Sequence, residues 1–129
     1  MSLGNKHLVN NYSSAKYSWL KSGGNITHLY KIHNQNDLNY LFESNKTKNQ
    51  SLLVIGNLSN TLIKDGGFRG IGIKLLGDFA NVKINSEYML VGAAVLDNYL
   101  SKFCYQRGIT GYEFLYTIPG SIGGNIFMN

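Results

Sequence analysis

The feature of this sequence that most constrains the fold is a short, uninterrupted apolar run, Leu52–Ile55. Such a run is typical of a strand that is buried on both faces, as in a small parallel sheet. Residues 27–33 alternate β-forming residues with others and predict another strand. Between the two, residues 37–44 carry apolar side chains at helical spacing, after Asn36 as a good helix N-cap. The order strand, helix, strand predicts a βαβ unit with a right-handed crossover.

The rest of the chain predicts further short elements. Residues 61–63 and 70–76 are expected to be strands around an Asp-Gly-Gly turn, and residues 82–84 and 88–93 to form a hairpin. A longer helix is expected from the apolar residues between Val95 and Phe103, and it should end at Arg107, because a basic residue in the last turn followed by a glycine is typical of a helix C-terminus. The predicted fold therefore mixes helices with strands.

Length and composition indicate one domain of ordinary size. The chain has 129 residues, of which 43% are hydrophobic and 15% charged, so it can bury a core and does not resemble a disordered tail. We expect residues 1–18 to be a loose polar arm and residues 19–129 to form the domain. Because the glycine-rich, apolar segment 120–129 stops abruptly, we also expect the chain to be a piece of a longer protein.

Cysteine content, hydrophobicity and charge indicate the cellular compartment and the kinds of partner. The single cysteine, Cys104, cannot form an intrachain disulfide, which indicates a reducing compartment. No stretch approaches the roughly 18 apolar residues of a membrane span. The net charge of +5 suits an anionic ligand, but the basic residues are spread evenly, without the stripe that nucleic-acid binding favours. We expect a cytoplasmic protein with no membrane and no nucleic-acid partner.

Three segments are candidates for binding a ligand. The first, loop 56–61 (GNLSNT), follows the apolar run directly. Successive backbone N–H groups in such a turn can bind an anion, and Ser and Asn side chains add donors. No dinucleotide-binding or P-loop glycine motif occurs, so loop amides rather than a helix N-terminus would hold a phosphate. The alternative is an ordinary turn rich in Asn and Ser.

The second and third candidates are rich in small residues. Segment 118–125 (IPGSIGGN) combines the only proline of the chain with three glycines, which lets backbone approach a flat or bulky ligand. Segment 91–94 (VGAA), at the end of a predicted strand, also consists of small residues that allow a ligand to approach the backbone closely. The alternatives are a packed loop for segment 118–125 and simple packing for segment 91–94.

The remaining reactive side chains do not form a site. His7, His28 and His33 lack the spacing of a metal site, and we expect no metal. Cys104 is expected to be a small buried hydrophobe.

In their order and spacing, the three segments resemble the FAD-binding domain of the UDP-N-acetylenolpyruvoylglucosamine reductase family. The resemblance covers residues 17–129, and its most specific stretches are residues 56–70 (GNLSNTLIKDGGFRG) and 111–129 (GYEFLYTIPGSIGGNIFMN). It implies an α+β fold of the vanillyl-alcohol-oxidase (PCMH) type, with FAD between two small α+β subdomains. The domain would end before a substrate-binding domain that this chain does not contain.

The resemblance also implies which residues bind the cofactor. Loop 56–61 would hold the pyrophosphate, and segments 118–125 and 91–94 would line the flavin and its phosphate arm. Three positions, Asn57, Leu58 and Ala94, depart from the glycine usual in the family. The implied cofactor-binding residues are Gly56, Asn57, Leu58, Ser59, Asn60, Thr61, Gly92, Ala93, Ile118, Pro119, Gly120, Ser121, Gly123 and Gly124.

The implied activity is an FAD- and NADPH-dependent reduction of UDP-N-acetylenolpyruvoylglucosamine to UDP-N-acetylmuramate in peptidoglycan synthesis, which supports cell wall formation, cell shape and division. The family's catalytic Arg, Ser and Glu would lie beyond residue 129, so no catalytic residue is assigned and the chain alone is expected to be inactive. The UDP-sugar would bind through the missing domain. FAD is expected to be non-covalent, since every His and Cys falls outside the three segments. The alternatives are another flavin oxidase of this fold and a non-redox nucleotide- or RNA-binding module.

Overall fold

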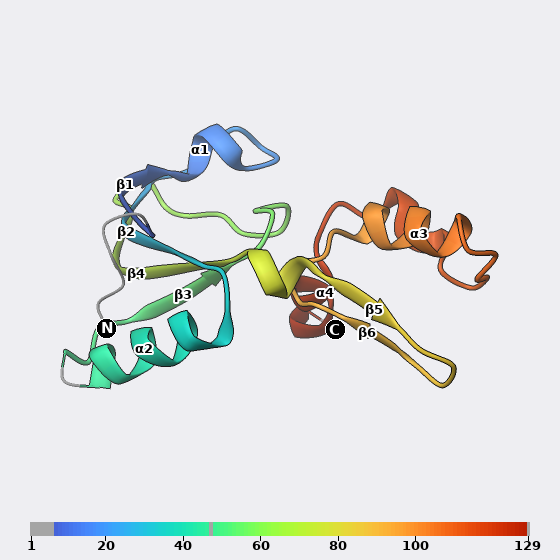
Figure 1. The fold of residues 1–129 in the computed structure, drawn as a ribbon. Helices are drawn as coiled ribbons and strands as arrows, with labels where there is room; N and C mark the ends of the chain where they lie inside the picture. The colour runs from blue at the N-terminus through green and yellow to red at the C-terminus, as the bar shows by residue number, and fades with distance from the viewer. Residues whose placement is uncertain (1–6, 47, 129) are drawn as a thin grey trace.

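The computed structural model describes residues 7–46 and 48–128, which form two halves joined by a short 3-10 turn (Figure 1). The first half holds a four-stranded sheet and the longest helix, and the second holds a hairpin and short helices. The elements are, in chain order, β1 Leu8–Ser13, α1 Ser14–Tyr17, β2 Asn25–Ile32, α2 Gln35–Lys46, β3 Leu52–Ile55, β4 Phe68–Leu75, η1 Gly77–Ala80, β5 Val82–Ile84, β6 Met89–Val91, α3 Asp97–Tyr105, η2 Glu113–Thr117 and α4 Ile122–Met128.

The sheet has the order β1-β2-β4-β3, with β4 parallel to both β2 and β3. The predicted strand–helix–strand unit is confirmed as β2, α2 and β3, and β4 lies between its two strands. Helix α2 covers one face, where Leu41 packs with Ile32, Ile71 and Ile73. It begins before the expected Asn36, because Asn34 caps it: the Asp37 N–H donates to Asn34 Oδ1 at 3.0 Å.

The prediction that Leu52–Ile55 is buried on both faces is wrong. Strand β3 lies at one edge of the sheet and, within the described residues, pairs only with β4. Leu52 is 37% exposed and Val54 is 63% exposed, and neither belongs to the core cluster under α2. A short apolar run gives no information on whether a strand is central or at an edge, and the central position is taken by β4.

The expectation of a loose arm over residues 1–18 is wrong for its described part, and residues 1–6 lie outside the described residues. Residues 8–13 form β1, which pairs antiparallel with β2. Tyr12 inserts into the core, and Ser14, at the start of α1, is fully buried and donates to the Gly24 carbonyl at 2.6 Å. The polar composition of β1 follows from its place at the other sheet edge.

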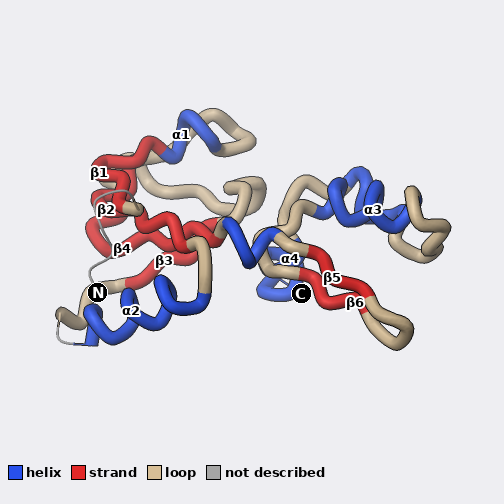
Figure 2. The backbone as a smooth tube through the Cα atoms, viewed as in Figure 1, coloured by secondary structure: helices blue, strands red, loops and turns tan. Residues whose placement is uncertain are grey.

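The segment after β3 also differs from its prediction. Residues 61–63 form no strand and follow an irregular path, drawn tan in Figure 2. Ile63 is nevertheless buried in the core cluster that contains Ile26, Leu29 and Ile55. Its apolar character therefore reflects packing over the sheet rather than strand pairing. The expected strand at residues 70–76 is confirmed as β4, Phe68–Leu75.

In the second half, the predicted hairpin is confirmed as β5 and β6, and the predicted helix as α3. Val95, Leu100, Cys104 and Leu115 form its core. Residues 122–125, expected within a loop, are instead the first turn of α4, because the Asn125 N–H donates to the Ser121 carbonyl at 2.9 Å. The two mixed halves confirm the predicted α+β class.

Candidate functional site

Loop 56–61 extends from the carboxyl end of β3, beside the carboxyl ends of the parallel strands β2 and β4. This is the edge of a parallel sheet at which ligands bind. Within the described residues, no backbone N–H of residues 57–61 takes part in a hydrogen bond, and neither do the side chains of Ser59, Asn60 and Thr61. Such free, successive donors are the arrangement that binds an anion.

Leu58 fixes the conformation of this loop. Its φ is +53°, a left-handed conformation that costs a non-glycine residue roughly 1–2 kcal/mol. The side chain is only 4% exposed and packs in the core with Ile55 and Ile63, while its carbonyl accepts from the Trp19 N–H at 3.4 Å. Burying a leucine side chain stabilises by roughly 1.5–3 kcal/mol, which offsets the strain. Leu58 thus anchors the loop, and its side chain faces the core rather than a ligand.

A hollow of about 150 Å³ opens beside the loop. It is lined by Ser18, Leu20, Ser22, Leu58, Ser59, Asn60, Thr61 and Leu62. Residues of loop 56–61 and of the stretch that follows α1 therefore border the same space.

Segment 118–125 is held against segment 91–94 by backbone hydrogen bonds. The Gly123 N–H donates to the Ala93 carbonyl at 2.9 Å, and the Ile122 N–H donates to the Val95 carbonyl at 3.0 Å. A Cβ on Gly123 would lie 2.8 Å from the Ala93 Cβ and 2.9 Å from its carbonyl oxygen. Only glycine therefore permits this contact, which brings the second and third predicted segments together.

Segment 118–125 also meets loop 56–61, across the junction of the halves. A Cβ on Gly56 would lie 3.0 Å from the Ser121 Oγ, and one on Gly120 would lie 3.8 Å from the Ser59 Oγ. The buried Ser121 pairs with Leu96 in an isolated antiparallel bridge. All three predicted segments therefore converge at one place, although each half supplies only part of them (Figure 1).

Asp97, which the sequence analysis did not single out, lies under this junction at the start of α3. It is fully buried, and its Oδ1 accepts from the Asn125 Nδ2 at 2.8 Å. Its Oδ2 is buried and has no partner among the described residues; a Cβ on Gly120 would lie 2.8 Å from it. Burial raises the pKa of the carboxyl, and the hydrogen bond from Asn125 opposes that rise.

Some predicted residues have a structural explanation without a ligand. A Cβ on Gly92 would collide with the Phe79 carbonyl, and the Gly92 N–H donates to the Asn81 carbonyl at 2.9 Å. This glycine lets segment 91–94 cross η1 closely. Ile118 and Pro119 are exposed at the rim of the junction.

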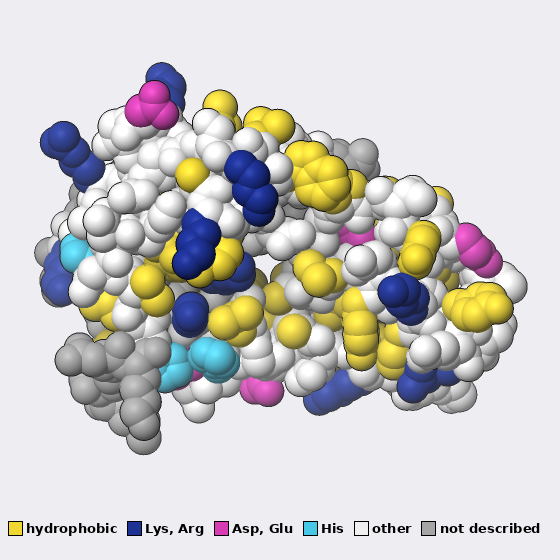
Figure 3. Space-filling model, turned by 90° about the horizontal axis from the view of Figure 1, so that it is seen from above, with side chains coloured by type: hydrophobic (Ala, Val, Ile, Leu, Met, Phe, Trp, Pro, Cys, Tyr) yellow, Lys and Arg dark blue, Asp and Glu magenta, His cyan; other side chains and the backbone are white. Residues whose placement is uncertain are grey.

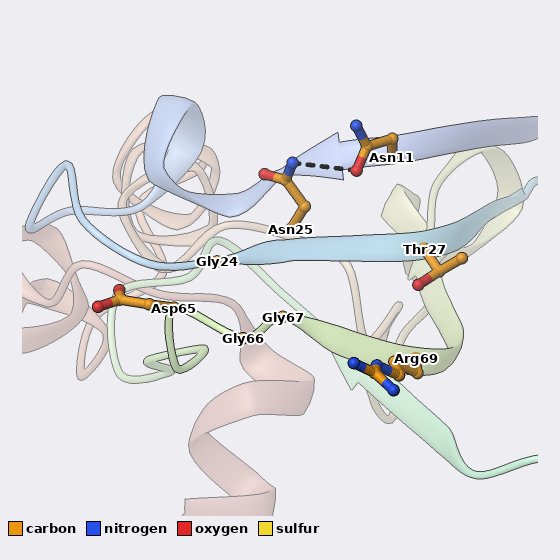
Figure 4. A pocket seen from close by; sticks show the side chains of 8 residues that line it. All are labelled: Asn11, Gly24, Asn25, Thr27, Asp65, Gly66, Gly67 and Arg69. Carbon is orange, nitrogen blue, oxygen red and sulfur yellow. Dashed lines mark hydrogen bonds between the residues drawn. The ribbon is translucent and has the colours of Figure 1, made fainter.

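A second hollow, of about 340 Å³, lies at the Gly66-Gly67 turn (Figure 4). The turn packs on residues 24–25: Gly67 has φ +76°, and a Cβ there would lie 2.6 Å from the Asn25 carbonyl oxygen. Figure 4 shows Asp65 and Arg69 at opposite ends of the hollow. This close backbone packing accounts for the DGG motif without a ligand.

The remaining reactive groups lie apart from the junction. Cys104 is fully buried, with its Sγ 4.0 Å from the Met89 Sδ, and burial raises the pKa of its thiol. The described residues contain no cluster of His, Cys, Asp or Glu fit to hold a metal.

None of the helices in the described part of the chain is long and apolar enough to cross a membrane.

Comparison with known proteins places the chain among flavin-binding proteins. A family model described as "FAD binding domain" matches residues 27–129. The UDP-N-acetylenolpyruvoylglucosamine reductase of Rickettsia felis is 41% identical over 118 residues, and that of Rickettsia typhi is 38% identical over 119 residues. Each alignment covers 92% of this chain, but the chain spans only 40% of the length of either relative.

A solved structure has the same fold. The crystal structure of UDP-N-acetylenolpyruvylglucosamine reductase from Thermus caldophilus matches with a TM-score of 0.69 and 27% identity, over 91% of this chain and 39% of that chain. The likeness confirms the predicted fold of the FAD-binding domain. Because the family model matches most of the sequence, the chain belongs to the family of FAD binding domains.

Proposed function

We propose that this chain is the FAD-binding portion of a cytoplasmic enzyme that uses NADPH to reduce UDP-N-acetylenolpyruvoylglucosamine to UDP-N-acetylmuramate. The relatives that carry this reductase name align with 92% of the chain. The observation that carries the proposal is loop 56–61, with five successive backbone N–H groups free of partners at the carboxyl edge of a parallel sheet. The family match favours this reading over a non-redox nucleotide- or RNA-binding module.

The residues at the junction fit a flavin nucleotide in two ways. The free N–H groups of residues 57–61 and the Ser59 and Asn60 side chains would donate to the pyrophosphate. Gly120 and Gly123, which have no Cβ, would let backbone approach the flavin and its phosphate arm. The further proposed contacts are Gly56, Thr61, Ala93, Ser121 and Gly124 from the same three segments.

When bound, FAD would supply the redox chemistry, accepting a hydride from NADPH and passing it to the enolpyruvyl double bond. This chain would bind and orient the cofactor. Positioning the UDP-sugar and supplying its proton would require residues outside this chain, since the curated relatives are much longer. We therefore expect no turnover of the UDP-sugar by the 129-residue chain.

Attachment of FAD is proposed to be non-covalent. The only thiol is buried against Met89, and His28 is hydrogen-bonded to Asn10 at 2.9 Å. Neither side chain belongs to the three segments. Acid precipitation of the FAD-loaded protein should leave a colourless pellet, and a yellow pellet would contradict the proposal.

Titration of the chain with FAD, followed by fluorescence quenching, tests the proposed function. A hydrogen bond to a charged group contributes roughly 1.5–3 kcal/mol. Removing the Asn60 amide in Asn60→Ala should therefore weaken FAD binding roughly 10- to 100-fold. Lys64→Gln is the control, because Lys64 lies outside the loop. Removing the Lys64 charge should weaken FAD binding less than Asn60→Ala does. An unchanged affinity for Asn60→Ala with a larger loss for Lys64→Gln would show that charge, not directed donors, holds the phosphate.

A further inference from the structure

A group of four basic side chains lies on the sheet half, outside the three predicted segments. Lys31 of β2 and Lys74 of β4 are register partners in the parallel ladder. Paired residues of neighbouring strands place their side chains on the same face of a sheet, about 5 Å apart. Two cationic side chains are therefore held side by side at the carboxyl ends of the parallel strands.

Two imidazoles complete the group. The Lys31 N–H donates to the His7 carbonyl at 2.8 Å, and the His7 Nδ1 lies 3.1 Å from the Lys31 carbonyl oxygen. The rings of His7 and His33 meet edge to face with centroids 5.3 Å apart. Figure 3 shows His and Lys or Arg side chains gathered over the sheet half of the face seen from above. We call Lys31, Lys74, His7 and His33 the basic cluster.

The two lysines of the basic cluster have no recorded acidic partner within the described residues. Within the described residues, neither the Lys31 nor the Lys74 ammonium takes part in an ion pair or hydrogen bond. Two acidic residues adjoin His33: the Asp37 Oδ2 accepts from the His33 backbone N–H at 3.2 Å and from the Asn34 amide, and the Asp78 N–H donates to the His33 carbonyl at 2.8 Å. Neither carboxylate has a recorded contact with the Lys31 or Lys74 ammonium within the described residues. Lys74 is partly buried, and both burial and the charge of Lys31 lower its pKa. An anion would relieve the repulsion between the two ammonium groups.

The position of the basic cluster indicates the kind of anion. On its other side, Lys74 pairs with Ile55, the last residue of β3, and loop 56–61 begins at the next residue. The cluster therefore lies beside the start of that loop, at the edge where parallel strands bind ligands. Closely spaced Lys and His donors suit the several acceptor oxygens of a phosphate group better than a single carboxylate.

We propose that Lys31, Lys74, His7 and His33 form a binding site for a phosphate group. Two sources share this chemistry: the pyrophosphate of FAD lying on loop 56–61, and the phosphate of a separate ligand. The site does not depend on the proposed function, because a phosphate anion alone can occupy it. This site could not be predicted from sequence, because the four residues are dispersed along the chain and the parallel pairing of β2 with β4 brings the two lysines together.

Calorimetric titration of the 129-residue protein with inorganic pyrophosphate tests the site. Lys31→Gln and Lys74→Gln should each weaken pyrophosphate binding about 10-fold, the loss of one hydrogen bond to a charged group. His33→Gln should weaken pyrophosphate binding less. Because His33 is exposed, this variant should fold normally, so it still tests the site if Lys74→Gln fails to fold. Lys83→Gln is the matched control, because Lys83 is exposed on β5 in the other half. Equal losses for Lys83→Gln and Lys74→Gln, or no loss for any of the cluster variants, would overturn the proposal.

Titrations with FAD and riboflavin then distinguish the two sources. If the cluster contacts the cofactor, Lys74→Gln should weaken FAD binding and leave binding of riboflavin, which has no phosphate, unchanged. If the phosphate belongs to a separate ligand, FAD affinity should be unchanged and the FAD-loaded protein should still bind pyrophosphate. Failure of the wild-type chain to bind FAD would refute the proposed function, while the pyrophosphate titration would still decide on the cluster.

Discussion

The two halves of the molecule are built by different means. In the sheet half, β2 and β4 pair across a long stretch of sequence, and buried residues on both faces of the sheet form separate clusters around Leu29 and Ile73. The second half has a hairpin of two three-residue strands and a single cluster around Leu100. The sheet half therefore provides a rigid base for loop 56–61, and the second half brings segment 118–125 to it.

The largest expected effect is on the core of the sheet half. Leu29 is fully buried in the core cluster that includes Leu58, so Leu29→Ala should lower the free energy of unfolding by roughly 2–5 kcal/mol. Val54→Ala, on the outermost strand at 63% exposure, should change it by less than about 0.5 kcal/mol. Denaturant unfolding measures both. A cost at Val54 as large as that at Leu29 would contradict the placement of β3 at the sheet edge.

A smaller loss of stability is expected from a change at the contact between segments 118–125 and 91–94. In Gly123→Ala the new methyl group would press on the Ala93 carbonyl, a backbone atom that cannot turn aside. Such overpacking typically costs about 1–3 kcal/mol, and the displaced segment should also weaken FAD binding. Gly66→Ala is the control, since Gly66 lies outside the three segments and a Cβ there would meet nothing within 4 Å. Indistinguishable FAD titrations for the two variants would show that the Gly123 contact does not shape the site.

The smallest effect, and the one most dependent on pH, concerns Asp97. The pKa of the Asp97 carboxyl is raised in the folded protein, mainly by burial. At pH values between the ordinary pKa and the raised one, the folded state therefore binds a proton that the unfolded state releases. Stability from this group is therefore complete below the ordinary value of 3.8 and is lost as pH rises through the raised pKa. Asp97→Asn keeps a side chain of the same shape without the charge and should flatten this part of the pH profile. Thermal unfolding from pH 4 to pH 8 measures it, and parallel profiles for both proteins would contradict the account.

The sequence predicted most elements, and the three segments that it singled out lie together in the structure. Periodicity located α2, α3, β4 and the hairpin, because each has a regular pattern of its own. Pattern could not reveal that β1 completes the sheet, since an edge strand with polar residues resembles a loop. It also could not place β3 at an edge, because that depends on β4 inserting between β2 and β3.

Residues that act through contacts distant in the sequence were beyond prediction. Asp97 looked like an ordinary acidic residue in the first turn of a helix, and only folding buries it against Gly120 and Asn125. Leu58 was recognised as a departure from glycine. That its side chain would enter the core, and so offset a positive φ, depends on the packing of loop 56–61 over the sheet.

The central claim is that segments from both halves form one flavin site, and hydrogen exchange with and without FAD tests it most directly. The free N–H groups of residues 57–61 have no partner within the described chain and should exchange fast without the cofactor. FAD should slow exchange in loop 56–61 and in residues 118–121 of the other half together, and should leave α2 unchanged. Protection confined to one half, or absent from loop 56–61, would contradict the account.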